Sequence, residues 1–289
     1  MLLKEVKNIF HAELDVIYGK DEVNSFFYLL IEHYFELERF VLALQPNLNI
    51  EKEQETILFK ALSELKLHKP IQHITGTAYF MDLAFAVNEH VLIPRPETEE
   101  LVRWVLDDVK EVKHFLNILD MGTGSGCIPI SLDKNLVDAK VYALDVSPQA
   151  LVVAEENNRT LGANVTFVKA DMLSLHSKTS AKELDQKFDI IISNPPYVRE
   201  LEKAEMQNNV IDHEPSLALF VPDEDPLKFY KAVVNFASEH LNKNGCLYLE
   251  INQYLGEETK QILQKSNFKT IELRLDMFGN DRMIKGIRK

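Results

Sequence analysis

The stretch LNILDMGTGSG, from Leu116 to Gly126, decides the fold that the sequence predicts. A short apolar run comes first, and glycines follow at alternate positions, Gly122, Gly124 and Gly126. The apolar run predicts a buried strand. Glycine lets the backbone turn sharply and come close to a ligand, because it carries no Cβ atom. A tight connection between a strand and a helix would use the same residues, so the surrounding sequence has to decide between these interpretations.

Apolar runs alternate with helical patterns on the C-terminal side of this stretch. Further strands are predicted at KVYALD, NVTFV, FDIIIS and CLYLEI, with helices over residues 129–136 and 148–161. This alternation predicts an α/β fold with a mostly parallel, doubly wound sheet that helices cover on both faces. In such a sheet a ligand binds beyond the carboxyl ends of the strands, where the strand order reverses.

The N-terminal part of the chain has a different pattern, which ends near Pro70. Apolar residues recur there at the spacing of helices. They are Val6, Ile9, Phe10, Leu14 and Ile17, then Phe26, Phe27, Leu30 and Ile31, then Ile57, Leu58, Ala61, Leu62 and Leu65. Residues 79–92 are typical of two short strands in a hairpin. We therefore expect an N-terminal helical domain over residues 1–76, a linking β-hairpin over 77–94 and a larger domain over 95–289.

Composition and charge restrict the possible functions. No apolar run approaches the roughly 20 residues that cross a bilayer, and the N-terminus lacks the apolar core of a signal peptide. We therefore expect a cytoplasmic protein with no membrane partner. Asp and Glu outnumber Lys and Arg by 45 to 32, which argues against a groove that binds nucleic acid through many phosphate contacts. Cys127 and Cys246 are expected to be small buried residues outside any site, and no metal is predicted.

Carboxylates follow the next strands along the chain. Asp145 ends KVYALD, where it could accept hydrogen bonds from both hydroxyls of a ribose. It could instead cap the following helix, although Ser147 can do so equally well. Asp171 and Met172 follow NVTFV. There a carboxylate could bind an exocyclic amino group, and a thioether could lie against a purine ring.

The residue that opens the glycine stretch indicates which nucleoside would bind. Asp120 stands at the end of the strand, where its negative charge would repel the pyrophosphate of a dinucleotide. A cationic nucleoside without phosphate would suit this position. S-adenosylmethionine, with its sulfonium and α-ammonium groups, has that chemistry.

Asn194-Pro195-Pro196-Tyr197 comes directly after the strand FDIIIS. Neither proline can donate a backbone hydrogen bond, so the strand must stop there and no helix can continue it. An amide side chain, free carbonyl groups and an aromatic ring then face whatever lies beyond the sheet. This arrangement is suited to a planar ligand, whereas the alternative is a simple loop after a strand.

Together these motifs resemble a known family. DMGTGSGCI, ADM and SNPPYV, in this order and with Asp145, are similar to motifs of class I methyltransferases that modify planar nitrogen. LIPRPETEELV and NPPY resemble the protein-glutamine methyltransferases of the HemK type. The resemblance runs from PIQHITG at Pro70 through HEPSLAL to GNDRM at Gly279. It implies a class I methyltransferase fold, Rossmann-like, with a mostly parallel seven-stranded sheet.

The resemblance also assigns roles to residues. It implies a site for S-adenosyl-L-methionine, with S-adenosyl-L-homocysteine as the product, formed by Asp120, Gly122, Thr123, Gly124, Ser125, Gly126, Asp145, Asp171, Met172, Asn194 and Thr98. Relatives often have an aromatic residue where Met172 stands. Thr98 could instead belong to a proline-stiffened connection between hairpin and helix. Glu214-Pro215 and Asn280-Asp281-Arg282 match the family too, and we expect structural roles near the site for them.

The same resemblance makes Asn194, Pro195, Pro196 and Tyr197 the catalytic residues. A carboxamide nitrogen is a poor nucleophile, because its lone pair is delocalised into the carbonyl. We expect the Asn194 side-chain oxygen and the Pro195 carbonyl to accept one N–H each, with Tyr197 against the amide plane. The nitrogen loses its proton readily once it is methylated, so no histidine base is required.

Release factors are the partner that the resemblance implies, through the glutamine of their Gly-Gly-Gln loop, and the helical domain is expected to dock them. No direct contact with nucleic acid is expected. A glutamine of a ribosomal protein is an alternative substrate. An adenine amino group of DNA or RNA is another, because it would fit the same tetrapeptide. A nucleoside-binding protein without activity is the non-enzymatic alternative.

Overall fold

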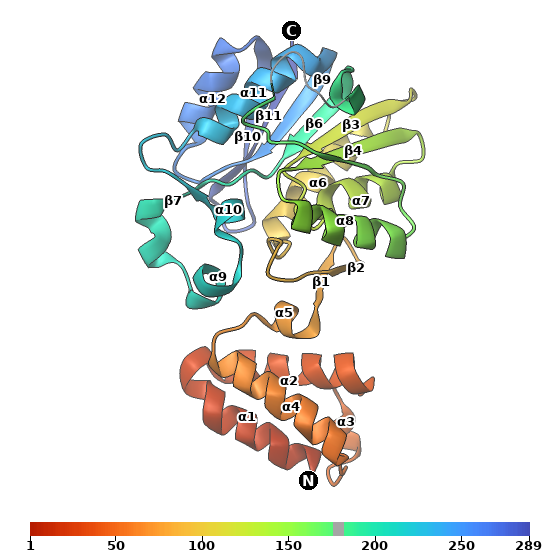
Figure 1. Cartoon of the computed structure of the whole chain (residues 1–289), viewed down its shortest axis with the longest axis vertical. Coiled ribbons are helices and arrows are strands. Elements are labelled where there is room, and N and C mark those ends of the chain that lie inside the picture. Colours follow the sequence, from red (N-terminus) through yellow and green to blue (C-terminus); the bar gives the residue numbers. More distant parts are fainter. Residues whose placement is uncertain (176–181) are drawn as a thin grey trace. The chain divides into compact units, whose positions relative to one another are not determined.

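The computed structural model describes residues 1–175 and 182–289, and Figure 1 shows its elements. The chain forms two compact units. The first comprises Met1–Gly76 with Gln207–His213, and the second comprises Thr77–Met206 with Glu214–Lys289. The short segment 207–213, which the sequence pattern placed in the larger domain, therefore groups with the helical unit.

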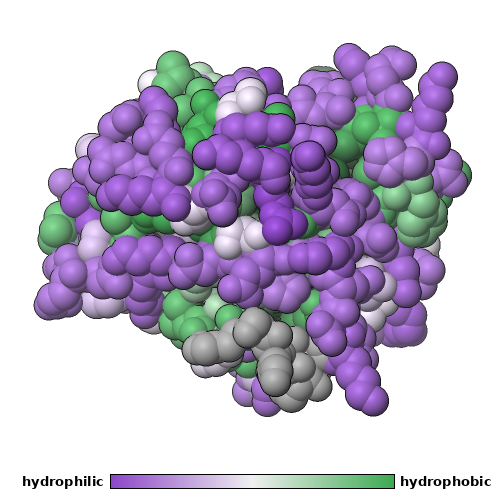
Figure 2. Space-filling model, turned by 90° about the horizontal axis from the view of Figure 1, so that it is seen from above, coloured by the Kyte–Doolittle hydropathy of each residue, from purple (hydrophilic) through white to green (hydrophobic). Residues whose placement is uncertain are grey.

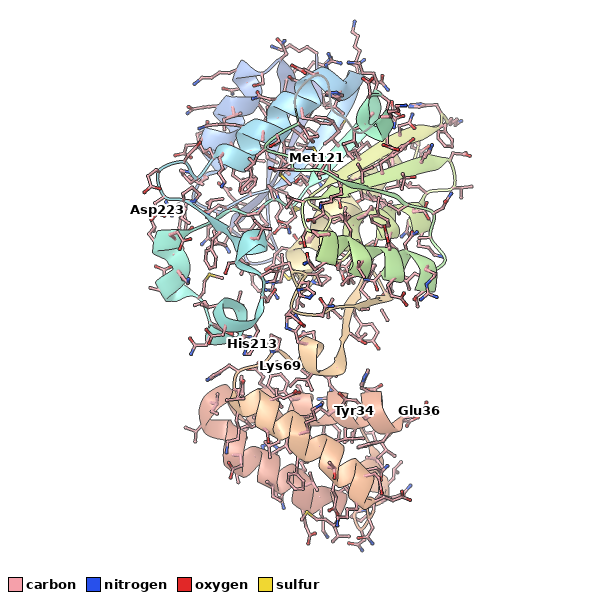
Figure 3. All side chains as sticks on the ribbon, viewed as in Figure 1. Tyr34, Glu36, Lys69, Met121, His213 and Asp223 are labelled. Atoms are coloured by element: carbon pink, nitrogen blue, oxygen red, sulfur yellow. The ribbon has the colours of Figure 1, made fainter. Side chains whose placement is uncertain are left out.

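The first unit is helical. Its helices are α1 (Leu3–Tyr18), α2 (Lys20–Phe35), α3 (Val41–Leu44), α4 (Lys52–Lys66), α5 (Ile71–Thr75) and α9 (Asn208–His213). The predicted apolar spacing places Phe10 and Phe27 in its core, where the two rings meet edge to face at 5.5 Å between centroids. Ile17, predicted on the same apolar face, is instead 41% exposed. His213, which is labelled in Figure 3, belongs to α9, and its ring donates a hydrogen bond of 2.9 Å to the Leu67 carbonyl oxygen.

The second unit begins with a hairpin of β1 (Thr77–Phe80) and β2 (Leu83–Ala86). Its strands are shorter than the predicted range 79–92 and begin earlier. Met81 and Asp82 form the turn with φ values of 49° and 61°, as a two-residue turn between twisted strands requires. The sequence did not reveal this turn, because it lacks the glycine that usually marks it.

The main sheet has the strand order β10-β11-β9-β6-β3-β4-β5. Its strands are β3 (Leu116–Met121), β4 (Ala139–Asp145), β5 (Thr166–Lys169), β6 (Phe188–Ser193), β9 (Leu241–Glu250), β10 (Phe268–Leu275) and β11 (Asp281–Arg288). β11 runs antiparallel to both β10 and β9, and the other neighbouring strands pair in parallel, so the predicted mostly parallel α/β sheet is confirmed. The sequence pattern did not locate β10 and β11, where charged residues such as Lys269 and Glu272 interrupt the apolar run.

Helices cover both faces of this sheet (Figure 1). They are α6 (Pro96–Val109), α7 (Cys127–Asn135), α8 (Pro148–Thr160), α11 (Lys228–His240) and α12 (Gly256–Lys265). This unit also contains the short helix α10 (Ser216–Leu219), the 3-10 turns η1 (Lys182–Leu184) and η2 (Glu200–Glu205) and the short strands β7 (Val198–Arg199) and β8 (Phe220–Val221). Successive residues of β3 face opposite sides: Ile118 packs with α6 and α7, and Leu119 packs with α11.

The strand order reverses at β3, which lies between β4 and β6. Both β4 and β6 run parallel to β3, so the loops that follow β3 and β6 leave the same edge of the sheet. The glycine stretch and the Asn-Pro-Pro-Tyr segment are these two loops. Topology alone therefore brings together the two motifs that the sequence singled out.

Hydrophilic side chains predominate on the face shown in Figure 2, with hydrophobic side chains in smaller groups between them. Among the described residues, no helix combines the length and apolar character needed to cross a bilayer.

Candidate active site

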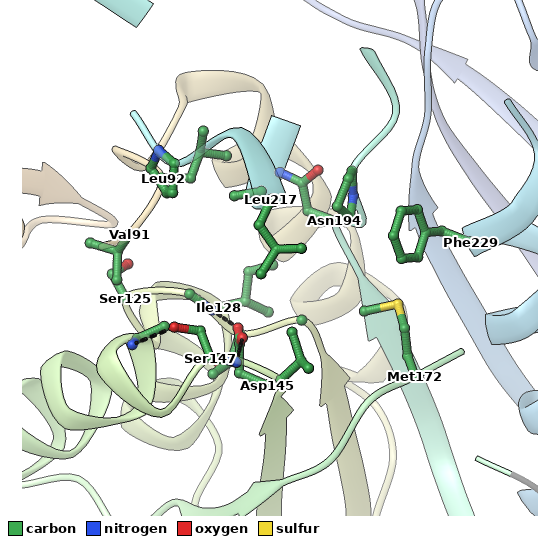
Figure 4. A pocket seen from close by; sticks show the side chains of 18 of the residues that line it. Val91, Leu92, Ser125, Ile128, Asp145, Ser147, Met172, Asn194, Leu217 and Phe229 are labelled. Carbon is green, nitrogen blue, oxygen red and sulfur yellow. Dashed lines mark hydrogen bonds between the residues drawn. The ribbon is translucent and has the colours of Figure 1, made fainter. Parts of the chain in front are cut away.

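A cavity of about 250 Å³ lies at the carboxyl ends of the strands where their order reverses (Figure 4). The loops after β3, β4, β5 and β6 contribute to its lining, as do residues before α6, in α10 and at the start of α11. The predicted site residues that line it are Gly122, Thr123, Gly124, Ser125, Asp145, Asp171, Met172, Asn194, Pro196 and Thr98. Asp120, Gly126, Pro195 and Tyr197 do not line it.

The glycine loop presents bare backbone to the cavity. Gly122 and Gly124 have φ values of +87° and +53°, a region that other residues rarely adopt. A Cβ atom at Gly122 would lie 2.8 Å from the Met172 Cε atom. A Cβ atom at Gly124 would meet nothing within 4 Å, because this residue faces open space. Gly126 precedes α7 and has a packing role, since a Cβ atom there would lie 3.0 Å from Ile130.

Asp145 connects the glycine loop to the loop after β4. Its Oδ2 atom accepts a hydrogen bond of 2.8 Å from the Gly124 amide, and its Oδ1 atom accepts one of 2.9 Å from the Ser147 amide. Ser147 in turn caps α8, as its Oγ atom accepts from the Ala150 amide at 3.1 Å. Burial raises the pKa of Asp145, and the backbone N–H groups oppose that shift. Each carboxylate oxygen retains capacity to accept from a ligand.

Asp120 lies fully buried beneath the loop. Burial raises its pKa to about 7, the nearby Thr123 hydroxyl opposes this effect, and the Asp145 carboxylate adds to it. Within the described residues, neither oxygen of Asp120 nor the Thr123 hydroxyl makes a hydrogen bond of ordinary geometry. Buried polar atoms without partners are costly, so this cluster is suited to a hydrogen-bond donor or a cation from a ligand.

The far end of the cavity is apolar. Met172 lines it, and Phe229 at the start of α11 lies on the same side in Figure 4. The sequence analysis did not single out Phe229, which adds an aromatic side chain to this part of the lining. Asp171 is held by the chain itself, because it accepts from the Leu173 amide at 2.9 Å and from the Ser174 hydroxyl at 3.2 Å.

Cys127 corrects a prediction, because it lines the cavity although we expected it outside any site. Burial raises its pKa to about 12, so it remains a thiol. Cys246 is only partly buried. Within residues 1–175 and 182–289, no group of three or more His, Cys, Asp or Glu side chains is arranged to hold a metal ion.

Tyr197 has a position different from the expected wall beside the amide. Its hydroxyl donates to Glu250 Oε1 at 2.9 Å, and its carbonyl accepts from the Asn252 amide group at 3.0 Å. Burial, together with the charge of Glu250, holds the pKa of Tyr197 well above its ordinary value. Tyr197 thus attaches the tetrapeptide to the carboxyl end of β9 and to the residues that follow it.

Asn194 makes a side-chain contact with α6. Its Nδ2 atom donates to Thr98 Oγ1 at 3.1 Å, and Thr98 Oγ1 donates to Glu250 Oε2 at 2.6 Å. Thr98 therefore lines the site and also lies in the first turn of α6, which begins with Pro96. Glu250 was missed in the sequence. An acidic residue within the apolar run CLYLEI was the available signal, because a buried carboxylate needs partners.

An ion pair closes another side of the cavity. The Arg95 Nη2 atom lies 2.5 Å from the Oε1 atom of the buried Glu214. The Oε2 atom of Glu214 accepts a hydrogen bond of 3.0 Å from the Ile93 amide. This pair fixes residues 93–95 to the segment that begins α10, which contributes Pro215 and Leu217 to the lining. The structural role expected of Glu214 agrees with these contacts.

The strand order and the cavity at its reversal point define a class I methyltransferase. The methyltransferase small domain model matches residues 102–217, and the PrmC N-terminal domain model matches residues 18–76. A release factor glutamine methyltransferase of Flavobacterium psychrophilum is 47% identical over 287 residues, which cover 99% of each chain. Another, of Bacteroides thetaiotaomicron, is 47% identical over 234 residues, 81% of this chain and 80% of the relative. The chain belongs to the release factor glutamine methyltransferase family.

The solved structures show the same fold at low identity. A methyltransferase of Pyrococcus furiosus has a TM-score of 0.52 and 18% identity, and the match covers 83% of this chain and 99% of that one. The predicted family resemblance and the predicted fold class are both confirmed.

Proposed function

We propose that this protein transfers a methyl group from S-adenosylmethionine to the side-chain amide nitrogen of the glutamine in the Gly-Gly-Gln loop of release factors. The observation that carries the proposal is that the Asn194 amide opens into the same cavity as the glycine loop and Asp145. The names of the relatives support the substrate. We place the reaction in the cytoplasm, without a membrane or a direct nucleic-acid partner.

The residues that line the cavity support S-adenosylmethionine as the cofactor. Gly122 and Gly124 hold the loop in a backbone conformation that other residues rarely adopt and place no side chain toward the cavity, and Asp145 offers acceptors to the ribose hydroxyls. Among the described residues, the Asp120 carboxylate has no hydrogen-bond partner, so a cationic ligand nearby would interact favourably with it. Met172 and Phe229 provide apolar contact for the adenine. S-adenosylmethionine supplies an electrophilic methyl group and leaves as S-adenosylhomocysteine.

Asn194 and Pro195 perform the substrate step in this proposal. The Asn194 Oδ1 atom and the Pro195 carbonyl accept one N–H each from the glutamine, which holds the nitrogen lone pair toward the methyl group. The prolines keep these acceptors free, because the chain cannot close a helix there. The methylated nitrogen releases its proton to water or a carbonyl. Positioning and exclusion of water supply most of the rate enhancement.

The helical unit is proposed to dock the release factor and to take no part in the chemistry. The proposal rests on the absence of the motif residues from that unit, since every residue that lines the cavity belongs to the other unit.

We expect methyl transfer from labelled S-adenosylmethionine to purified release factor, and none to a DNA duplex or to ribosomal protein at equal concentration. The three substrates separate the proposed function from its alternatives, because the duplex offers an adenine amino group and the two proteins offer glutamine amides in different sequences. Label in the duplex or the ribosomal protein, with none in the release factor, would refute the proposal. Label in none of the three would favour a binding protein without activity.

We expect Asp145→Ala to weaken S-adenosylmethionine binding by about 2 kcal/mol, because ribose hydroxyls lose their acceptors in a closed site. This corresponds to a Kd that rises roughly 30-fold in calorimetry. Ser147→Ala removes the cap of α8 and keeps the carboxylate, so it controls for local disruption. Asp138→Ala, at an exposed position directly before β4, controls for a loss of charge. An unchanged affinity in Asp145→Ala would exclude the ribose assignment.

A further inference from the structure

The Asn194 amide is part of a chain of hydrogen bonds that starts at a buried carboxylate. Glu250 is 1% exposed and Thr98 is 2% exposed. From Glu250 the chain runs through Thr98 to Asn194, with donor–acceptor distances of 2.6 Å and 3.1 Å. On its other oxygen Glu250 accepts from Tyr197, so both oxygens of the carboxylate are in use.

The direction of each hydrogen bond in this chain follows from chemistry. An ionised carboxylate has no proton and can only accept. The single hydroxyl proton of Thr98 is therefore committed to Glu250, and Thr98 can only accept from Asn194. Because Asn194 must then present its NH₂ group to Thr98, its Oδ1 atom is turned away from α6. That atom is the acceptor that the proposed reaction needs.

One cation and two hydroxyl donors near Glu250 act toward the ionised form of its carboxyl group. Arg282 donates to the Tyr197 hydroxyl at 3.4 Å, and Asp276 fixes its guanidinium through a bond of 3.0 Å. Burial, with a contribution from the Glu97 carboxylate, holds the pKa of Glu250 above its ordinary value, although Thr98, Tyr197 and Arg282 act in the opposite direction. The direction of the chain rests on its geometry, in which the hydroxyls of Thr98 and Tyr197 each lie within hydrogen-bond distance of one oxygen of the Glu250 carboxylate.

We propose that Glu250 and Thr98 are positioning residues that set the orientation of the Asn194 amide, so that the target glutamine meets an acceptor and not a second NH₂ group. The proposal rests on the proposed function. It assigns a role to a carboxylate that lines no part of the cavity and that would otherwise be an unexplained buried charge.

The first test compares Thr98→Val with Thr98→Ser in the full-length protein. Valine keeps the shape and loses the hydroxyl, whereas serine keeps the hydroxyl. We expect Thr98→Val to lower the single-turnover transfer rate roughly tenfold, with the Kd of S-adenosylmethionine unchanged within about twofold. Thr98→Ser is expected to retain the wild-type rate within about threefold. Equal rates for Thr98→Val and wild type, or equal losses in both variants, would overturn the proposal.

The second test uses a signature that simple loosening of the site would not produce. A release factor with glutamate at the target position places a carboxylate against two acceptor oxygens in the wild-type enzyme, so it should compete poorly. In Thr98→Val the freed amide can turn its NH₂ group toward that carboxylate. We expect the inhibition constant of the glutamate variant to improve several-fold relative to the KM of the natural substrate. A ratio that stays constant would contradict the assigned role.

A third measurement needs no release factor and so separates this inference from the proposed function. In ¹⁵N-labelled protein, the Asn194 side-chain NH₂ resonance is identified by its absence in Asn194→Ala. We expect slow hydrogen exchange of this group in wild type and in Thr98→Ser, and fast exchange in Thr98→Val. Fast exchange in wild type would overturn the inference, whereas failure of wild type to methylate release factor would refute only the function.

Discussion

Asn194→Ala is expected to lower the single-turnover rate of methyl transfer by roughly 100-fold or more, with the affinity for S-adenosylmethionine within about threefold of wild type. The substitution removes an acceptor that orients the nucleophile, and it leaves the glycine loop and Asp145 in place. The glutamine can still enter the cavity, but its lone pair is no longer held in line with the methyl group. Rapid-quench measurements with labelled cofactor give the rate, and calorimetry gives the affinity.

Asn135→Ala is the matched control for this experiment. Its amide donates to the Ser131 carbonyl at 2.8 Å at the end of α7, and it does not line the cavity. We expect it to transfer at the wild-type rate. Agreement of Asn194→Ala with wild type within a factor of about three would place the substrate site elsewhere and leave the tetrapeptide as a loop after a strand.

Replacing the target glutamine of the release factor by glutamate is expected to abolish transfer. Glutamate has no N–H donors and places a carboxylate against the Asn194 and Pro195 oxygens, whose partial negative charges repel it. Asparagine keeps both donors but withdraws the nitrogen by about one bond length. Because a misplacement near 1 Å can cost ~100-fold, its rate is expected to fall by at least that factor.

Mass spectrometry of the intact release factors measures this series directly. Binding of each variant to the enzyme, followed separately, shows whether the loss occurs in docking or in chemistry. Methylation of the asparagine variant at close to the natural rate would show that the two acceptors do not define the position of the nitrogen.

The sequence predicted the parts of the site that depend on local backbone chemistry. Glycines at positive φ, a carboxylate at a strand end and two adjacent prolines each indicate their own geometry. Strand alternation then predicted a parallel sheet, and the rule for ligand sites in such sheets brought Gly124 and Asn194 to one edge. The cavity in the structure contains both residues.

The contacts that the sequence did not predict are those made across long separations. Thr98 reaches Glu250 only because α6 packs on the same face of the sheet to which that residue of β9 points. Phe229 lines the cavity from α11, a helix that comes several elements after β3 and β6 along the chain. No local pattern encodes such pairings, because they arise from the packing of whole helices on the sheet.

The grouping of residues 207–213 with the helical unit limits how this chain can be divided. The backbone leaves the second unit before α9 and returns to it at Glu214, so neither unit is a single continuous segment of the chain. A gene truncated to begin at Thr77 would keep α9 and lose Leu67, whose carbonyl accepts from His213. Exchange of the N-terminal unit between relatives, or its removal, therefore requires cuts at three places in the gene. A chimaera joined only at Gly76 would keep residues 207–213 of this chain, although the helical unit with which they group would come from the relative.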